Sequence, residues 1–153
     1  MEKKVLSSDE VREKILKGNL DFKEITVKGN LDLREITVEG NLDFEGATVK
    51  GSLDIEEITF KGYLYLGGIT IEGNLNFRGV TVEGDLNFKR VTVERNLNIE
   101  RTTVKGNLCF REATIEENLN LVAVTVGGLD LEEITVKGYL FLSIKKGSKI
   151  ESM

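Results

Sequence analysis

Histidine and cysteine, which often act as catalytic bases, nucleophiles and metal ligands, are nearly absent: the chain contains no histidine and only one cysteine, Cys109. Without histidine, no side chain serves as a general base near neutral pH at its ordinary pKa. Two columns of polar residues remain, each recurring along the chain. One is a threonine that repeats from Thr26 to Thr135, and the other is a set of carboxylates, Asp21, Asp32, Asp43 and Asp54. Spaced carboxylates suggest a calcium ladder.

The residues beside these columns favour a structural role for both. Lys23, Lys28 and Arg34 offset the repulsion between the aspartates, and later repeats carry asparagine in their place. The threonine column is similar to the flat arrays of ice-binding proteins, but charged neighbours such as Glu24 interrupt it. We therefore predict no catalytic residue, no metal and no cofactor. Cys109 occupies the aspartate position of its repeat and is expected to face water.

Both columns belong to an eleven-residue repeat that begins at Gly18 with the sequence GNLDFKEITVK. Each copy holds two triplets, such as Leu20-Asp21-Phe22 and Ile25-Thr26-Val27, in which apolar residues flank a polar one. This alternation is typical of β-strands, and the polar links between triplets predict corners. Copies of such a unit bury their apolar residues only by stacking, so the pattern predicts a β-solenoid. One copy lacks a residue between Val126 and Leu129, a change that a corner can absorb.

The charges at the residue after each first triplet indicate how many copies make one coil. Stacking adjacent copies gives three opposite and three like charge pairs, whereas stacking alternate copies gives five opposite pairs and one like pair, Lys89 with Arg111. The core supports the same choice, because alternate copies place mostly phenylalanine in one column and mostly aliphatic residues in the other. We therefore expect 22 residues per coil, with 11 as the alternative.

The triplets resemble the repeat of pentapeptide-repeat proteins, most closely at Ala47-Thr48-Val49. The resemblance covers about residues 18–142 and implies a right-handed, quadrilateral parallel β-helix. Two departures predict a wider coil: most first positions hold Leu or Ile in place of Ala, and every second face has six residues. Some members of that family mimic DNA and bind topoisomerases, which makes this activity an alternative function here.

The N-terminal segment, residues 1–17, is expected to form a helix that covers the first coil. Ser7 and Glu10 form a capping box, and Leu6 and Val11 form a hydrophobic staple. The apolar stripe of this helix consists of Val11, Ile15 and Leu16. The solenoid is expected over residues 18–142, and residues 143–153 are expected to be a tail or an end contact.

Exposed aromatic residues are the candidates for binding a partner. They form two pairs, Tyr63 with Tyr65 and Tyr139 with Phe141. The C-terminal end has no evident cap, so either the segment after Leu142 folds back over the last coil or that coil contacts a second copy. We expect the second, an end-to-end homodimer. Self-assembly into filaments is the alternative.

The overall composition narrows the class of protein. The net charge of −5 and the interleaved charges argue against a nucleic-acid ligand, and no apolar run is long enough to span a membrane. A lone cysteine and the lack of a signal-like segment point to the cytoplasm, and abundant Glu and Lys fit a thermostable protein. The sequence therefore predicts a non-enzymatic structural or protein-interaction solenoid.

Overall fold

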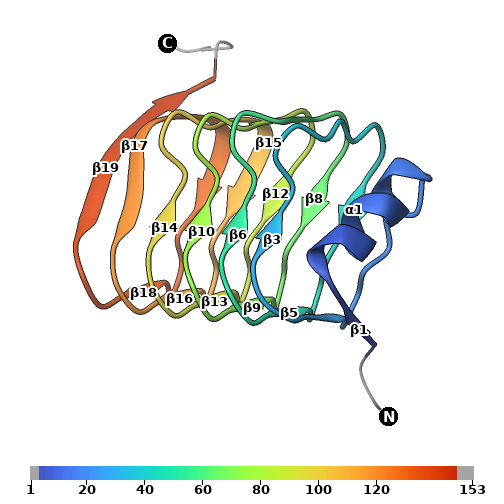
Figure 1. Cartoon of the computed structure of the whole chain (residues 1–153). Helices are drawn as coiled ribbons and strands as arrows, with labels where there is room; N and C mark the ends of the chain where they lie inside the picture. Colours follow the sequence, from blue (N-terminus) through green and yellow to red (C-terminus); the bar gives the residue numbers. More distant parts are fainter. Residues whose placement is uncertain (1–3, 148–153) are drawn as a thin grey trace.

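The computed structural model describes residues 4–147, which wind into a parallel β-solenoid with one helix at its start (Figure 1). Equivalent strands lie one above the other at a spacing of 22 residues: Thr26 pairs with Thr48, and Leu31 with Leu53. The coil therefore contains two sequence repeats, as the charge pattern predicts, and the chain completes about six turns. No helix in the described residues is long and apolar enough to cross a membrane.

Each coil has four faces, which we name A to D in chain order. Face A is a seven-stranded sheet of β1 (Val5–Leu6), β2 (Thr26–Val27), β5 (Thr48–Val49), β9 (Thr70–Ile71), β13 (Thr92–Val93), β16 (Thr114–Ile115) and β18 (Thr135–Val136). Face B holds β3 (Leu31–Asp32), β6 (Leu53–Asp54), β10 (Leu75–Asn76) and β14 (Leu97–Asn98), followed by the starts of β17 (Leu119–Asp130) and β19 (Leu140–Lys146). Face C holds β7 (Thr59–Phe60), β11 (Thr81–Val82) and the start of β15 (Thr103–Cys109), and face D holds β4 (Leu42–Asp43), β8 (Leu64–Tyr65), β12 (Leu86–Asn87) and the end of β15.

The last coils differ from the first because β15, β17 and β19 continue around corners. The residue missing after Val126 is absorbed at one corner, where the register between β15 and β17 shifts between Val104 and Asn107. A second shift between β17 and β19 leaves Ala123 without a register partner. Both shifts lie at corners, so the inward residues keep their columns.

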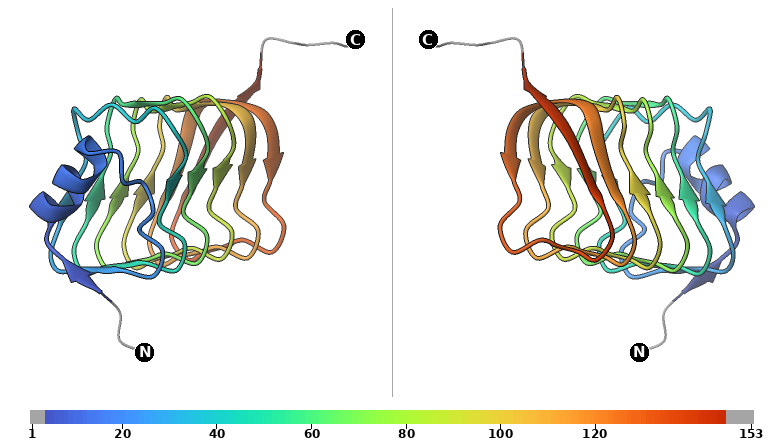
Figure 2. Two further views of the ribbon diagram at one scale, coloured as in Figure 1. Left: turned by 90° about the vertical axis from the view of Figure 1, so that its right-hand side faces the viewer. Right: turned by 90° about the vertical axis from the view of Figure 1, so that its left-hand side faces the viewer.

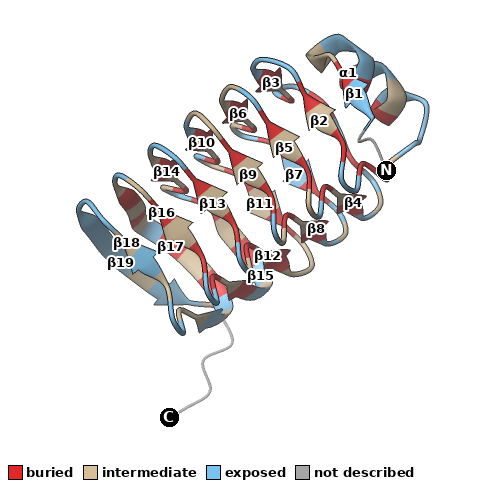
Figure 3. Ribbon diagram, turned by 90° about the horizontal axis from the view of Figure 1, so that it is seen from below, coloured by how far each residue is buried: buried red, intermediate tan, exposed pale blue. Residues whose placement is uncertain are grey.

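The buried apolar residues form one core cluster along the solenoid, and Figure 3 shows buried residues in the strands of successive coils. The expected phenylalanine column is present on face D, where Phe22 stacks on Phe44 with ring centroids 5.1 Å apart and Phe88 stacks on Phe110 at 5.0 Å. Phe77, from face B, packs edge to face against Phe88 at 5.5 Å. Thr102 is the one buried polar residue among those described, and its hydroxyl donates a hydrogen bond of 2.6 Å to the Phe77 carbonyl.

Polar side chains join one coil to the next. The amide oxygen of Asn74 accepts a hydrogen bond from the backbone N–H of Asn96, and Asn96 repeats this toward Asn118. Ion pairs follow the same spacing, as between Arg90 and Glu112. These pairs are exposed, so each adds little to stability, but they favour the observed register over a slipped one.

The two ends of the solenoid carry different structures, helix α1 (Ser8–Leu16) at one and strand β19 at the other (Figure 2). The expectation for Leu16 is wrong, because this residue is 71% exposed, whereas Val11 and Ile15 are buried. The solenoid also extends beyond residue 142, because Ser143 and Lys146 still pair with β17. Residues 148–153 of the expected tail and residues 1–3 lie outside the described residues.

Candidate interface at the C-terminal end

The two aromatic pairs lie on different parts of the solenoid and do not form one site. Tyr63 and Tyr65 lie on the middle coils, at the entry to face D, with ring centroids 5.7 Å apart. Tyr139 and Phe141 lie on the last coil, at face B, with ring centroids 6.2 Å apart. The structure therefore offers two separate aromatic patches.

The Tyr63–Tyr65 patch is only partly open. The Tyr63 ring lies over Gly84, where no side chain could be added without displacing it. Burial raises the pKa of the Tyr65 hydroxyl, and the nearby Tyr63 and Asp85 raise it further. A shallow hollow lined by Glu45, Gly67, Gly68, Lys89 and Arg90, among others, lies on the same coils, and it carries both signs of charge.

The last coil exposes residues that every earlier coil buries. Leu140 and Leu142 belong to the columns of Leu119 and Leu121, which are fully buried, yet they are 47% and 54% exposed. Their exposure has a simple cause, since no coil follows β19 within the described residues. Phe141 is 48% exposed beside them, and Figure 3 shows β18 and β19 as the exposed end of the stack.

Strand β19 also has a free backbone edge. Earlier strands of face B donate to the next coil, as in the 2.9 Å bonds from Leu97 N–H to the Asn118 carbonyl and from Leu119 N–H to the Tyr139 carbonyl. Leu140 is the next residue of this column, and its N–H has no acceptor among the described residues. The asparagine ladder ends here too, because its last acceptor, Asn118, binds the N–H of Tyr139, which is aromatic. An apolar strand with an unpaired edge readily pairs with another strand.

The opposite end is closed by helix α1, whose N-terminus has the geometry expected from the sequence. The Ser7 hydroxyl accepts from Glu10 N–H at 3.1 Å, and the Glu10 carboxylate accepts from Ser7 N–H at 2.8 Å. This second bond lowers the pKa of Glu10. Leu6 and Val11 are buried, so the helix is held in a fixed position against the first coil.

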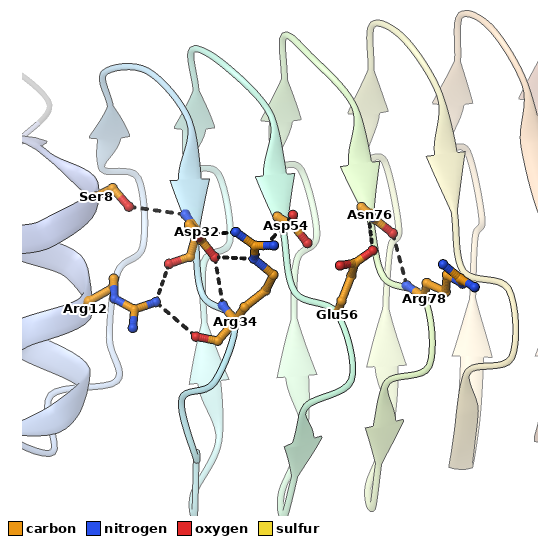
Figure 4. Close-up of polar contacts among 8 residues, drawn as sticks. All are labelled: Ser8, Arg12, Asp32, Arg34, Asp54, Glu56, Asn76 and Arg78. Atoms are coloured by element: carbon orange, nitrogen blue, oxygen red, sulfur yellow. Dashed lines mark hydrogen bonds and ion pairs between the residues drawn. The ribbon is translucent and has the colours of Figure 1, made fainter.

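Two polar side chains of α1 take the place of a strand on the edge of β3 (Figure 4). The Arg12 guanidinium donates to the carbonyls of Asp32, at 2.7 Å, and Arg34, at 3.1 Å. The Ser8 hydroxyl accepts from the N–H of Asp32 at 3.1 Å. These groups face away from the next coil and would otherwise be open to another chain. Neither Ser8 nor Arg12 was among the residues predicted from the sequence to hold this end, although their spacing of four residues places them on one side of the helix.

The aspartate and asparagine column has a structural role. The side chains of Asp43 and Asn98 each accept a bond from the backbone N–H two residues on, which fixes the corner after the first triplet. The described residues contain no group of three or more His, Cys, Asp or Glu side chains arranged to hold a metal ion. Cys109, at the same position on face D, is half-buried.

A comparison with known proteins found no matching family model, no matching curated protein and no matching solved structure. Within residues 4–147 the fold is a repeat β-helix in which α1 covers the first strand of face B and no element covers the last one, β19.

Proposed function

We propose that this chain is a non-enzymatic interaction solenoid that binds a second copy of itself through its C-terminal end. One observation carries the proposal: on face B the N-terminal edge is closed by Ser8 and Arg12, while the β19 edge is apolar and has no partner strand among residues 4–147. Contacts between two C-terminal ends are the same from both sides and stop at two copies. Filaments need a head-to-tail contact, which α1 obstructs.

The charges of the last coil favour a second copy as the occupant. Glu132 and Glu133 are exposed at one side of this coil, where Glu132 already pairs with Arg111 at 2.7 Å, and Lys145 and Lys146 are exposed at another. A surface that carries both signs on separate sides can complement itself when one copy is turned over, because opposite charges then meet. The apolar strand between them supplies the burial that drives association.

A solenoid with pentapeptide-like repeats fits this function. The repeats share the polar–apolar alternation of that family and differ by their larger first residue, which widens the core. DNA mimicry is the weaker alternative, because basic residues pair with acidic ones along the rod, as Lys105 does with Glu83 and Arg95 with Glu117. Such pairs interrupt the continuous acidic stripe that a DNA mimic presents. The Tyr63–Tyr65 patch remains our predicted surface for a different protein.

Analytical ultracentrifugation tests the proposal. We expect a species of twice 17.1 kDa whose fraction rises with concentration. Leu142→Asp should leave a monomer, because it places a charge at the buried contact. Leu16→Asp is the matched control, an exposed leucine at the closed end, and should still dimerise. Far-UV circular dichroism shows whether each variant is folded.

Three outcomes would contradict the proposal. A folded wild-type chain that stays monomeric at high concentration overturns it. Species that grow without limit indicate filaments, and tight binding to a topoisomerase at low salt without dimerisation indicates DNA mimicry.

A further inference from the structure

We infer that the two copies join through β19, which pairs antiparallel with the partner's β19 about a twofold axis at Phe141, so that the two B faces form one continuous sheet. This inference rests on the proposed dimer and specifies its geometry. Strand β19 forms the open edge of face B with its first three residues, Leu140–Leu142, before it turns onto face C.

The backbone of β19 fits such a pairing. In face B the N–H groups of the inward residues point to the next coil, as Leu75 donates to Asn96 and Phe77 to Asn98. The carbonyls of inward residues point the same way, as shown on face D by the bond from Asp43 N–H to the Leu20 carbonyl. Leu140 and Leu142 thus present both groups at the free edge. In an antiparallel pair, opposite residues of this kind exchange two hydrogen bonds, so Leu140 meets the partner's Leu142.

The same axis covers the exposed core. The side chains of Leu140 and Leu142 point inward, so antiparallel pairing packs them against the partner's leucines and makes the two cores continuous. Phe141 points outward and lies directly opposite the partner's Phe141, with Tyr139 beside it. Aromatic side chains directly opposite each other are favourable cross-strand pairs.

The charges select this axis over the others. A twofold axis through the middle of face B places face C of each copy against face A of its partner. Lys145 and Lys146 lie on face C, so they meet the side of the partner that carries Glu133. Lys137 is already paired with Glu116 at 3.0 Å and stays on its own chain. An axis through face C would instead place Lys145 against the partner's Lys145, and like charges directly opposite destabilise a strand pair.

Disulfide trapping tests the axis. In a Cys109→Ser background, Phe141→Cys should form an intermolecular disulfide on mild oxidation and migrate at twice its mass. Its two Cα atoms would be about 4.5 Å apart in a non-hydrogen-bonded pair, within the range for disulfides. Lys145→Cys is the control and should not cross-link, because the axis places the two copies of this residue on opposite sides of the solenoid. Sedimentation under reducing conditions establishes that each variant is a dimer before oxidation.

A charge reversal gives a test that does not depend on Phe141. Glu133→Lys should weaken the dimer severalfold, and adding Lys146→Glu should restore it. A dimer in which Lys145→Cys cross-links, in which both cysteine variants cross-link equally, or in which neither does, overturns the inference but leaves the proposed function intact. A wild-type chain that is monomeric overturns both.

Discussion

The residues with the least favourable backbone conformation in this solenoid lie at its corners. The repeat occurs eleven times between Gly18 and Lys137, and in every copy the residue before the second triplet has a positive φ, between 57° and 71°. Only three of these positions hold glycine, Gly46, Gly68 and Gly79. The others hold Glu, Arg or Ala, for which this conformation costs about 1 kcal/mol. Packing between coils therefore maintains a backbone shape that the local sequence does not prefer.

Substitutions at two adjacent glycines, Gly67 and Gly68, distinguish the cost of a positive φ from the effect of adding a side chain. We expect Gly68→Ala to lower the free energy of unfolding by about 1 kcal/mol, because Gly68 has a φ of 69°. Gly67→Ala should leave it unchanged or raise it slightly, since Gly67 is not in this conformation and its nearest neighbouring atom would be 3.5 Å away. Urea denaturation measures both. Equal effects of the two substitutions would contradict this explanation.

Asp54 is the weak member of its column. Its Oδ1 atom is buried without a hydrogen-bond partner in the described structure. Burial raises the pKa of Asp54, and the neighbouring Glu56 raises it further. Later coils carry Asn76 and Asn98 in this column. Asp54→Asn should therefore stabilise the protein by about 1 kcal/mol at pH 7, and this gain should vanish below pH 3.8, where the native aspartate is also neutral.

Asp32 gives the control with the opposite sign. Two hydrogen bonds from the Arg34 guanidinium, at 2.9 and 3.0 Å, lower the pKa of Asp32 to about 2. Its charged form stabilises the fold above pH 3.8, and this contribution is lost as the pH falls through about 2. Asp32→Asn should therefore be destabilising at pH 7 and progressively less so toward pH 2. Urea denaturation at several pH values compares the two variants, and the same sign for both would refute the assignment.

At the level of elements, α1 acts as a strand substitute. It supplies one acceptor from Ser8 and two hydrogen bonds from Arg12 to an edge that is otherwise one coil short. Side chains on a helix can satisfy a strand edge without extending the sheet, which prevents a further chain from pairing with it. Strand β19 has no such cover among the described residues. This difference between the ends predicts different consequences when each is altered.

Removing the arginine should open the closed end. Arg12→Ala is expected to lower the free energy of unfolding by roughly 1–2 kcal/mol, because two backbone carbonyls lose a charged donor. It should also produce species larger than a dimer, since β3 can then accept another chain. Lys14→Ala, on the same helix, removes a cation that makes no hydrogen bond or ion pair in the described structure and should change neither property. Light scattering and urea denaturation distinguish these outcomes.

At the level of the whole molecule, each coil contacts mainly the coils before and after it. Stability is then a sum over coils and their interfaces, so a complete coil can be removed without changing the rest. Deleting residues 62–83, which form one 22-residue coil, joins Lys61 to Gly84 and restores the repeat. We expect a folded protein that unfolds cooperatively with a smaller urea m-value, in proportion to the surface lost. Loss of the β-sheet circular dichroism signal would contradict this expectation.

Much of the fold was predictable from the sequence because repetition multiplies weak signals. A single charge pair says little, but five opposite pairs among alternate copies identified the 22-residue coil. The capping box was predictable because it depends on Ser7 and Glu10 alone. The role of Arg12 was not predictable, because its acceptors are backbone carbonyls 20 and 22 residues away. Every residue has such a carbonyl, so the residue type does not identify the acceptor. Leu16 and the continuation of β19 to Lys146 also depend on tertiary contacts.

The coil-by-coil arrangement also gives unfolding a direction. The first coil is held by the buried residues Val11 and Ile15 of helix α1 and by Arg12, whereas the last coil contacts only the coil before it among the described residues. Thermal loosening should therefore begin at β19 and travel toward α1, and amide hydrogens should exchange in that order. If a second copy binds at that end, the least stable end of each chain lies at the centre of a longer rod. Both outer ends of the dimer are then the ends that α1 covers.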